Sequence, residues 1–322
     1  MCIAKRFLAA ALLALLWAAP SSSQVIDLDV KPAKEKPEVW AKASEAGTAR
    51  AVEAARKDAC VRLVEAAYRL PVSTNRDVLD MMIRSLPANK DLTSELGKAK
   101  TVSTEYLDDG TARVTVATTP AEVAGILKKA YEKVDWDQAE EDGVIAAVAQ
   151  MTKAETQLLG VGEAALEGSP AEKRIPVRRA ALVKAERDIA AKILAMVIDD
   201  GVERKHVRDF VLFFMPVSRK VALGMTAARI ESEKFAPDGS IELRAEVNAT
   251  DVVSLVYRAE SLYDLKNQWS NSSFGALLTS TREMVFAADA KAAAAEASPR
   301  TDTPLVLELQ AVNEALKVTP KD

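Results

Sequence analysis

The apolar positions of this sequence predict two long amphipathic helices with the same spacing of apolar residues. Five apolar residues in the stretch 48–70 recur at spacings of three and four, which is one face of an α-helix. They are Val52, Ala55, Ala59, Leu63 and Ala67. An apolar face with the same spacing recurs 130 residues later, at Leu182, Ala185, Ile189, Ile193 and Val197. Both helices run into a breaker, Pro71 in the first stretch and Asp200-Gly201 in the second.

A second repeated signal is an Asp-Gly turn followed by strict alternation of apolar and polar residues. It occurs at Asp109-Gly110 and again at Asp238-Gly239, 129 residues later, and each predicts a β-hairpin with one buried face. At the same offset, the segment 78–83 aligns with the segment 207–212, and Asp80 aligns with Asp209. In the strand before each turn, the apolar residues of the two copies do not align position by position, which predicts a β-bulge in one of the two copies.

These signals together predict an α+β fold made of two tandem copies of a small β-α-(α)-β-β unit. In each copy a helix packs on an antiparallel sheet. Opening strands are expected at 38–44 and 156–164, and connecting helices after the hairpins, with Thr119 and Thr250 as N-caps. The predicted division is a signal peptide 1–23, a linker 24–37, a first repeat 38–119, a helical connector 120–155, a second repeat 156–249, a C-terminal helical segment 250–286, and an Ala-rich linker with a mobile tail 287–322.

The first residues have the pattern of a secretory leader. Lys5 and Arg6 precede 13 apolar residues from Phe7 to Ala19, and small residues follow up to Gln24. That run is too short for a comfortable membrane span, while an uncleaved anchor is the alternative. The sequence therefore predicts an exported protein, periplasmic or associated with the outer membrane. The formal charge of −4 is unfavourable for nucleic-acid binding, and Cys60 is the single cysteine beyond the leader, so no disulfide within the mature chain is expected.

Candidate chemistry is sparse, and each pattern has a structural interpretation beside the functional one. His206 is the single histidine, which excludes histidine clusters for metals. The stretch 160–165 formally reads G-x-G-x-x-A, but no helix follows promptly, so strand glycines in close packing are favoured over a dinucleotide site. The acid pairs Asp108-Asp109 and Asp199-Asp200 and the run 140–142 fit turns and helix ends better than glycosidase carboxylates. We expect no enzymatic activity and no cofactor or metal.

Contact residues are predicted from one basic cluster and one aromatic. Arg178 and Arg179 lie in a basic stretch, 173–187, that is typical of a solvated helix face and that is also suited to peripheral contact with anionic lipid headgroups. Trp269 is a candidate anchor for a protein partner, whereas Trp40 is expected in the core. We therefore name Trp269, Arg178 and Arg179 as possible partner contacts.

The block from 57 to 116 resembles a known family in the order of its motifs. These are an Ala-rich helix with Asp58-Ala59, a Val-containing turn, the basic segment GKAKTV at 97–102 and the hairpin YLDDGTARVTV at 106–116. The block resembles the FlgP/Lpp-type bacterial outer-membrane lipoproteins, related to the N-terminal domain of flagellar assembly protein T. The resemblance covers residues 38–118 well and 156–248 more loosely. It implies a helix packed on an antiparallel sheet, a periplasmic location at the outer membrane, and a non-enzymatic role in envelope or flagellar assemblies, often as oligomers. The family's lipidation cysteine is missing after the leader.

The function expected from these observations is that of a structural or assembly factor acting through protein–protein contacts. Its expected partners are envelope or outer-membrane proteins and further copies of itself. The alternative is a binding module that holds a small ligand, a glycan or a lipid headgroup between the two repeats.

Overall fold

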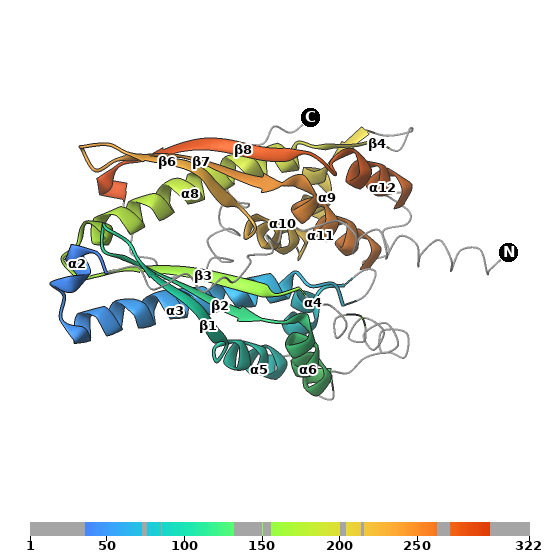
Figure 1. Ribbon diagram of the computed structural model, residues 1–322. Coiled ribbons are helices and arrows are strands. Elements are labelled where there is room, and N and C mark those ends of the chain that lie inside the picture. Colours follow the sequence, from blue (N-terminus) through green and yellow to red (C-terminus); the bar gives the residue numbers. More distant parts are fainter. Residues whose placement is uncertain are drawn as a thin grey trace. The chain divides into compact units, whose positions relative to one another are not determined.

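The fold contains two antiparallel three-stranded sheets, each covered by one long helix (Figure 1). The computed structural model describes residues 36–72, 76–84, 86–131, 150, 156–199, 204–213, 216–262 and 271–296. The predicted leader, most of the 120–155 connector, the acids at 140–142 and the tail from 297 lie outside these residues. Below, the first half means residues 38–166 and the second half means residues 169–296.

The first half packs helix α3 (Glu45–Tyr68) on a sheet with the strand order β1-β2-β3 (Figure 1). The strands are β1 (Lys100–Tyr106), β2 (Thr111–Thr118) and β3 (Leu158–Ala165). Its shorter helices are α2 (Glu38–Ala41), α4 (Val78–Arg84), α5 (Leu86–Leu96) and α6 (Pro120–Tyr131).

The second half packs helix α8 (Pro170–Leu194) on a sheet with the order β6-β7-β8. The strands are β6 (Arg229–Phe235), β7 (Ile241–Asn248) and β8 (Val285–Ala292), and a two-stranded ribbon is formed by β4 (Val197–Asp199) and β5 (Arg204–His206). Its shorter helices are α9 (Val207–Phe213), α10 (Pro216–Met225), α11 (Ala249–Leu262), α12 (Asn271–Ser280) and the 3-10 turn η1 (Ala294–Glu296). The α+β class is therefore confirmed.

The long helix of the first half lies unusually close to its sheet because β3 offers glycines. A Cβ on Gly160 would lie 2.1 Å from the Ala59 carbonyl oxygen, and one on Gly162 would lie 2.1 Å from the Ala59 nitrogen. Helix backbone therefore occupies the space where side chains would stand. The G-x-G pattern is thus used for helix–strand packing, which is the interpretation that the sequence favoured.

The two hairpins are built alike, down to their irregularities. Gly110 and Gly239 have φ of 89° and 80°, which glycine adopts without steric cost. The Thr111 N–H donates to Asp109 Oδ1, and the Ser240 N–H donates to Asp238 Oδ1, both at 2.9 Å. The pairing register shifts between Thr101 and Ser103 in the first sheet and between Ile230 and Ser232 in the second, at the same 129-residue offset. The bulge predicted for one copy is present in both.

The predicted opening strand at 38–44 is wrong, because this segment forms helix α2 and a turn that ends at Ser44, the N-cap of α3. Trp40 is buried, its ring meets Tyr106 edge-on at 4.9 Å, and its Nε1 donates to the Leu107 carbonyl oxygen at 2.9 Å. One helical turn brings the indole over the end of the β1–β2 hairpin, so the segment covers the hairpin instead of pairing with it.

The strand expected at 156–164 does form, but it belongs to the other sheet. It is β3, and it pairs antiparallel with β2 along its whole length, from Thr111↔Ala165 to Thr118↔Leu158. Each sheet is therefore closed by a strand that follows its hairpin, where the sequence interpretation placed one before it.

The third strand of the second sheet comes from the Ala-rich stretch, which the sequence interpretation divided between a helical segment and a linker. In β8 the side chains of Phe286, Ala288, Ala290 and Ala292 lie opposite the inward-facing residues of β7, while Asp289 and Lys291 are exposed. Alanine favours helices, but pairing with β7 provides backbone hydrogen bonds and a buried face for every second alanine.

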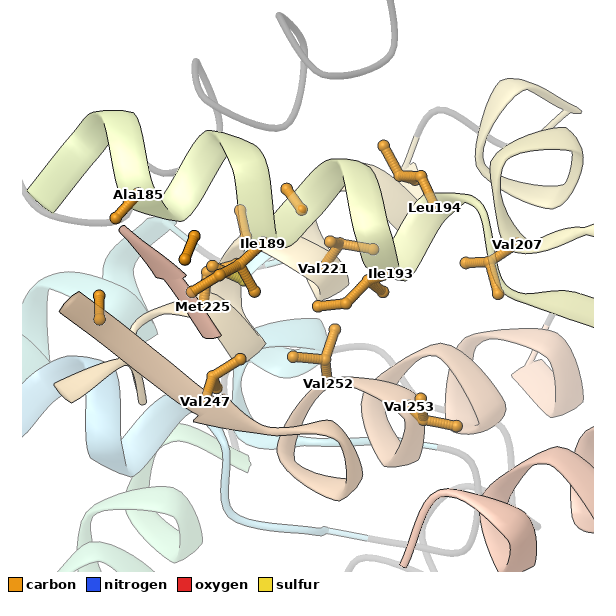
Figure 2. Packing of buried hydrophobic residues seen from close by; sticks show 14 of the residues in the cluster. Ala185, Ile189, Ile193, Leu194, Val207, Val221, Met225, Val247, Val252 and Val253 are labelled. Carbon is orange, nitrogen blue, oxygen red and sulfur yellow. The ribbon is translucent and has the colours of Figure 1, made fainter. Parts of the chain in front are cut away.

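The core of the second half is a continuous layer between α8, the sheet and the helix pair α10–α11. Figure 2 shows Ile189 and Ile193 of α8 beside Val221 and Met225 of α10, with Val252 of α11 close to them. All five are essentially inaccessible to solvent. At roughly 1.5–3 kcal/mol for each fully buried side chain, this layer is a main contribution to the stability of the fold.

The buried faces of the two long helices correspond at an offset of 126 residues, one helical turn from the 130 read in the sequence. Both helices are followed by an antiparallel bridge, Pro71↔Asp77 in the first half and Val197↔His206 in the second. A face with apolar residues at every fourth position looks the same after a shift of four, so periodicity alone could not distinguish the two offsets. The order of elements occurs twice, while its origin in a duplication stays a prediction.

Of the two predicted N-caps, one is confirmed and one is wrong. Thr119 caps α6: the Glu122 N–H donates to its Oγ1 at 3.2 Å, and the Thr119 N–H donates to Glu122 Oε2 at 3.0 Å. The hydroxyl of Thr118 also donates to Glu122, and these bonds hold the pKa of Glu122 below its usual value. Thr250 lies inside α11, and its hydroxyl donates to the Arg282 carbonyl oxygen at 3.3 Å.

Candidate functional site

The most unusual group of side chains is a buried charge cluster where the two halves meet, and it begins at the first turn of α4. Asp77 is the N-cap of this helix, and Asp80 is the third residue inside it. The Asp77 N–H donates to Asp80 Oδ2 at 3.0 Å, and the Asp80 N–H donates to Asp77 Oδ1 at 3.2 Å. This reciprocal capping fixes both carboxylates before any partner from the second half is considered.

Lys220 of α10 supplies the opposite charge from the second half. Its Nζ lies 2.5 Å from Asp77 Oδ2 and 2.5 Å from Asp80 Oδ2. The exposed fractions of the three side chains are only 4% for Lys220, 0% for Asp77 and 8% for Asp80. A charge-assisted hydrogen bond in such a dry environment is stronger than one at the surface, but both ions also lose their hydration.

Arg258 of α11 completes the cluster with a second positive charge. Its Nη1 donates to the Arg69 carbonyl oxygen, just beyond the end of α3, at 3.4 Å. The guanidinium is also close enough to Asp77 and Asp80 to act on them electrostatically. Two carboxylates from the first half are thus balanced by two cations from the second.

The pKa shifts of Asp77 and Arg258 show that this cluster is shielded from water. Burial raises the pKa of Asp77 to about 6, even though the nearby Lys220 acts to lower it. Burial also lowers the pKa of the Arg258 guanidinium. In both cases desolvation is the largest cause, and it disfavours the charged form of each group.

Apolar side chains from the second half also enter the core of the first half. Leu223 of α10 and Leu255 of α11 belong to the hydrophobic core of the first half, together with Met81 and Met82 of α4. The helix pair α10–α11 is therefore buried on two sides, by its own core and by the first half. The cluster fixes the position of this contact, because any slip of α10 would leave buried carboxylates without their cation.

A carboxylate with a raised pKa beside a lysine is also a pattern found in acid–base catalysis. Here both partners are almost completely buried and bonded to each other. Two open surface hollows, of about 570 and 480 Å³, lie elsewhere along β7–β8, the first beside α8 and the second beside β6. Neither is lined by Asp77, Asp80, Lys220 or Arg258. The cluster therefore acts at the buried contact between α4 and the α10–α11 pair.

Arg178 and Arg179, predicted as partner contacts, are bonded inside the molecule. Arg178 forms an ion pair with Glu163 of β3, and its Nη1 lies 3.6 Å from Glu233 Oε1 of β6. Arg179 donates to the Glu163 carbonyl oxygen at 3.2 Å and lies 3.6 Å from Asp58 of α3. The side chains are only 19% and 28% exposed, so this part of α8 joins the two sheets. Trp269 lies outside the described residues.

His206, another residue that the sequence singled out, lies at the start of a helix. The N–H of His206 donates to Asp209 Oδ2 at 2.8 Å, at the start of α9. His206 and Asp209 thus occupy in α9 the places that Asp77 and Asp80 occupy in α4, which explains the alignment of Asp80 with Asp209. Among the described residues, no group of three or more His, Cys, Asp and Glu side chains is placed to hold a metal ion.

Sequence reasoning missed this buried cluster: Asp80 was noted only for its alignment with Asp209, and Asp77, Lys220 and Arg258 were not named. The available signal was a charged residue on an apolar helix face: Val217, Leu223 and Gly224 lie at spacings of three and four from Lys220. A lysine on such a face lies either at the boundary of the core or opposite a buried acid. Its partner, 143 residues earlier, cannot be identified from spacing.

Comparisons with known proteins leave the chain without an identified relative. No protein-family model, no curated protein and no solved structure matches it. Within the part of the chain that the structure describes, no helix is both long and apolar enough to span a membrane.

Proposed function

We propose that this protein is a non-enzymatic component of the bacterial cell envelope that acts as a structural or assembly factor through protein–protein contacts. The observation that carries the proposal is the docking of α10–α11 onto α4. Here a helix face of one α+β unit is buried against a helix of the next, and the ionisable groups at the contact hold the two units together. A unit that offers such faces is suited to assembly with other units.

The secretory leader and the family resemblance support an exported location, periplasmic or at the outer membrane. The test is fractionation of cells that carry the full chain with a C-terminal epitope. We expect the protein in the periplasmic or outer-membrane fraction, shortened by the leader. Recovery from the cytosol at full length would contradict the proposal.

The assembly role is tested by chemical crosslinking in intact cells followed by affinity purification. We expect crosslinked products that contain envelope proteins, further copies of the chain, or both. A flagellar role, which the resemblance suggests, is tested by motility after deletion of the gene. A protein that stays uncrosslinked at every crosslinker length, under conditions where a known envelope complex is captured, would refute the assembly role.

A further inference from the structure

The short segment that leads from β3 into α8 recurs at the end of the described chain. Residues 167–170 read Glu-Gly-Ser-Pro, and residues 296–299 read Glu-Ala-Ser-Pro. The second copy follows the first by 129 residues, which is also the offset between the two hairpin turns and between their two bulges. The contacts that the first copy makes therefore indicate what the second copy is suited to do.

The first copy holds the start of α8 on the tip of the first hairpin. The Leu166 N–H donates to the Gly110 carbonyl oxygen at 2.8 Å. The Ala171 N–H donates to the Asp109 carbonyl oxygen at 3.0 Å. Ser169 lies so close to the turn that a Cβ on Gly110 would be 2.3 Å from the Ser169 Cβ. We call the space beside the turn glycine, which Ser169 fills here, the seat of the hairpin.

The second hairpin has the same turn and a seat of its own. The Gly239 N–H donates to the Ala236 carbonyl oxygen at 3.0 Å, the distance that the corresponding bond has in the first hairpin. Of the described residues, only Ala294 would come within 4 Å of a Cβ on Gly239, and its 3.5 Å is an ordinary van der Waals contact. Within the described ranges, no backbone N–H donates to the carbonyl oxygen of Asp238 or Gly239. The second seat therefore has room for a serine.

Two further observations concern what covers this second tip. Ser240 is only 3% exposed, and its Oγ has no hydrogen-bond partner among the residues that the structure describes, although most buried side-chain polar atoms have one. The chain also leaves the described part beside the tip, because η1 lies next to the turn of the β6–β7 hairpin (Figure 1). Ser298 follows Glu296 by two residues, which span at most about 7 Å, so it is within reach of the second seat.

We propose that residues 297–299 dock on the tip of the second hairpin as residues 168–170 dock on the first, and that a helix begins at Pro299. Ser298 fills the seat beside Gly239, and the backbone after Pro299 donates to the Asp238 carbonyl oxygen. Serine is a preferred N-cap and proline a preferred first residue of a helix. Apolar residues at spacings of four, three and four then form one helix face, at Leu305, Leu309, Val312 and Leu316.

This contact lies within one chain, so it does not depend on the assembly function proposed above. The start of the tail belongs to the second half, whereas the sequence predicted a linker and a mobile tail from residue 287. The C-terminal helix is thereby held at a fixed place on the second hairpin, as α8 is held on the first.

The test is cleavage by trypsin after Arg300, which is the one tryptic site between Lys291 and Lys317. A docked segment is cleaved only when it opens, so the cleavage rate reports the equilibrium between the docked and the open form. The reference is a synthetic peptide of residues 292–322, which lacks the hairpin. We expect the intact protein to be cleaved after Arg300 at least about tenfold more slowly than the peptide, with the products assigned by mass spectrometry.

Two substitutions in the tail test the seat without changing any described residue. Ser298→Glu introduces a side chain that is too long for the close contact with Gly239, so its cleavage rate should rise to that of the matching peptide. Ala297→Glu is the matched control, because it adds the same charge one residue earlier. At Gly168, the counterpart of Ala297, a Cβ would meet no atom within 4 Å, so the control should stay protected.

A second pair of variants tests the seat from the side of the hairpin. Gly239→Ala fills the seat, so it should speed cleavage after Arg300. Gly168→Ala is its control, since Gly168 has a φ of 77° beside the 80° of Gly239, and both variants therefore carry similar backbone strain. Circular dichroism checks that each variant is folded, and the tail variants decide the question if either glycine variant is not.

Three results would overturn this proposal. Equal cleavage of the intact protein and the peptide would show that the tail does not dock. Protection that persists in Ser298→Glu would show that the tail is held at a place other than the seat. Equal loss of protection in Ser298→Glu and Ala297→Glu would show that the added charge, and not the fit beside Gly239, controls the opening of the tail.

Discussion

Replacement of Lys220 by methionine should be among the most destabilising single changes in this protein, and its cost should depend on pH. The change keeps most of the side-chain volume and removes the charge that lies 2.5 Å from both Asp77 and Asp80. Removing one partner of a buried ion pair typically costs about 3–5 kcal/mol, because the other charge remains buried without compensation. We expect a loss of this size in the free energy of unfolding at about pH 7.5, which lies above the pKa of about 6 of Asp77.

The pH dependence follows from the pKa of Asp77, which burial raises from 3.8 to about 6 in the folded protein. Between these values the folded state binds more protons at Asp77 than the unfolded state does, so stability falls as the pH rises through this window. For Asp77 alone, a difference of about two pKa units corresponds to about 3 kcal/mol. Without Lys220 the pKa of Asp77 rises further, since a cause that lowers it has been removed.

The assay is urea unfolding followed by circular dichroism, at about pH 5 and about pH 7.5, with Arg219→Met as the control. Arg219 is the neighbour of Lys220 on α10 and is exposed, so its replacement should change stability by less than about 0.5 kcal/mol. Lys220→Met should cost clearly less at the lower pH, where Asp77 is protonated. The additional change Asp80→Asn should recover much of the loss, because the one remaining acid, Asp77, then faces the one remaining cation, Arg258. A loss below about 1 kcal/mol at about pH 7.5, or one that is equal at both pH values, would refute this account of the cluster.

Three further predictions concern close packing, backbone conformation and the buried thiol. Gly162→Ala should lower the free energy of unfolding by about 1–3 kcal/mol or more, because its Cβ would lie 2.1 Å from the Ala59 nitrogen; an unchanged thermal midpoint would contradict the close approach of α3 to β3. Gly110→Ala should lower the free energy of unfolding more than Gly168→Ala does. Both glycines have positive φ, but only at Gly110 would a Cβ lie 2.3 Å from the Ser169 Cβ. Chemical denaturation of the two variants side by side measures the difference, and equal losses would show that backbone strain alone matters. Cys60 is 8% exposed, and burial raises the pKa of its thiol, so a thiolate-directed reagent should modify it slowly in the folded protein and rapidly in urea; fast labelling of Cys60 in native buffer, mapped by mass spectrometry, would contradict its burial.

The repeated local signals of the chain were readable because they depend on residues close together in sequence. The Asp-Gly turns needed glycine at a positive φ, and the structure has it at Gly110 and Gly239. The α+β class followed from a helix period and a strand period in neighbouring stretches. The alignment of Asp80 with Asp209 was also visible in the sequence. In the structure, each of these carboxylates accepts a hydrogen bond from the N–H of the residue at the start of its own helix.

Strand order was not readable, because pairing depends on partners far away in the chain. Nothing in the sequence of β3 indicates that it belongs to the sheet that precedes it rather than to the unit of the helix that follows it. In β8, alanine has a local preference for helix, and only the edge offered by β7 makes the alternation at Ala288, Ala290 and Ala292 a buried face.

The candidate site divides in the same way between local and distant causes. The sequence by itself determined the capped helix start at Asp77 and Asp80, because capping acts over three residues. It also determined that Lys220 lies on an apolar helix face. Only the tertiary structure decided that these residues meet, over 143 and 140 positions, and that burial turns an ordinary helix cap into an ionic contact between two halves. The physical reason is that hydrogen bonds and helix period act locally, whereas desolvation depends on everything that the folded chain brings to one place.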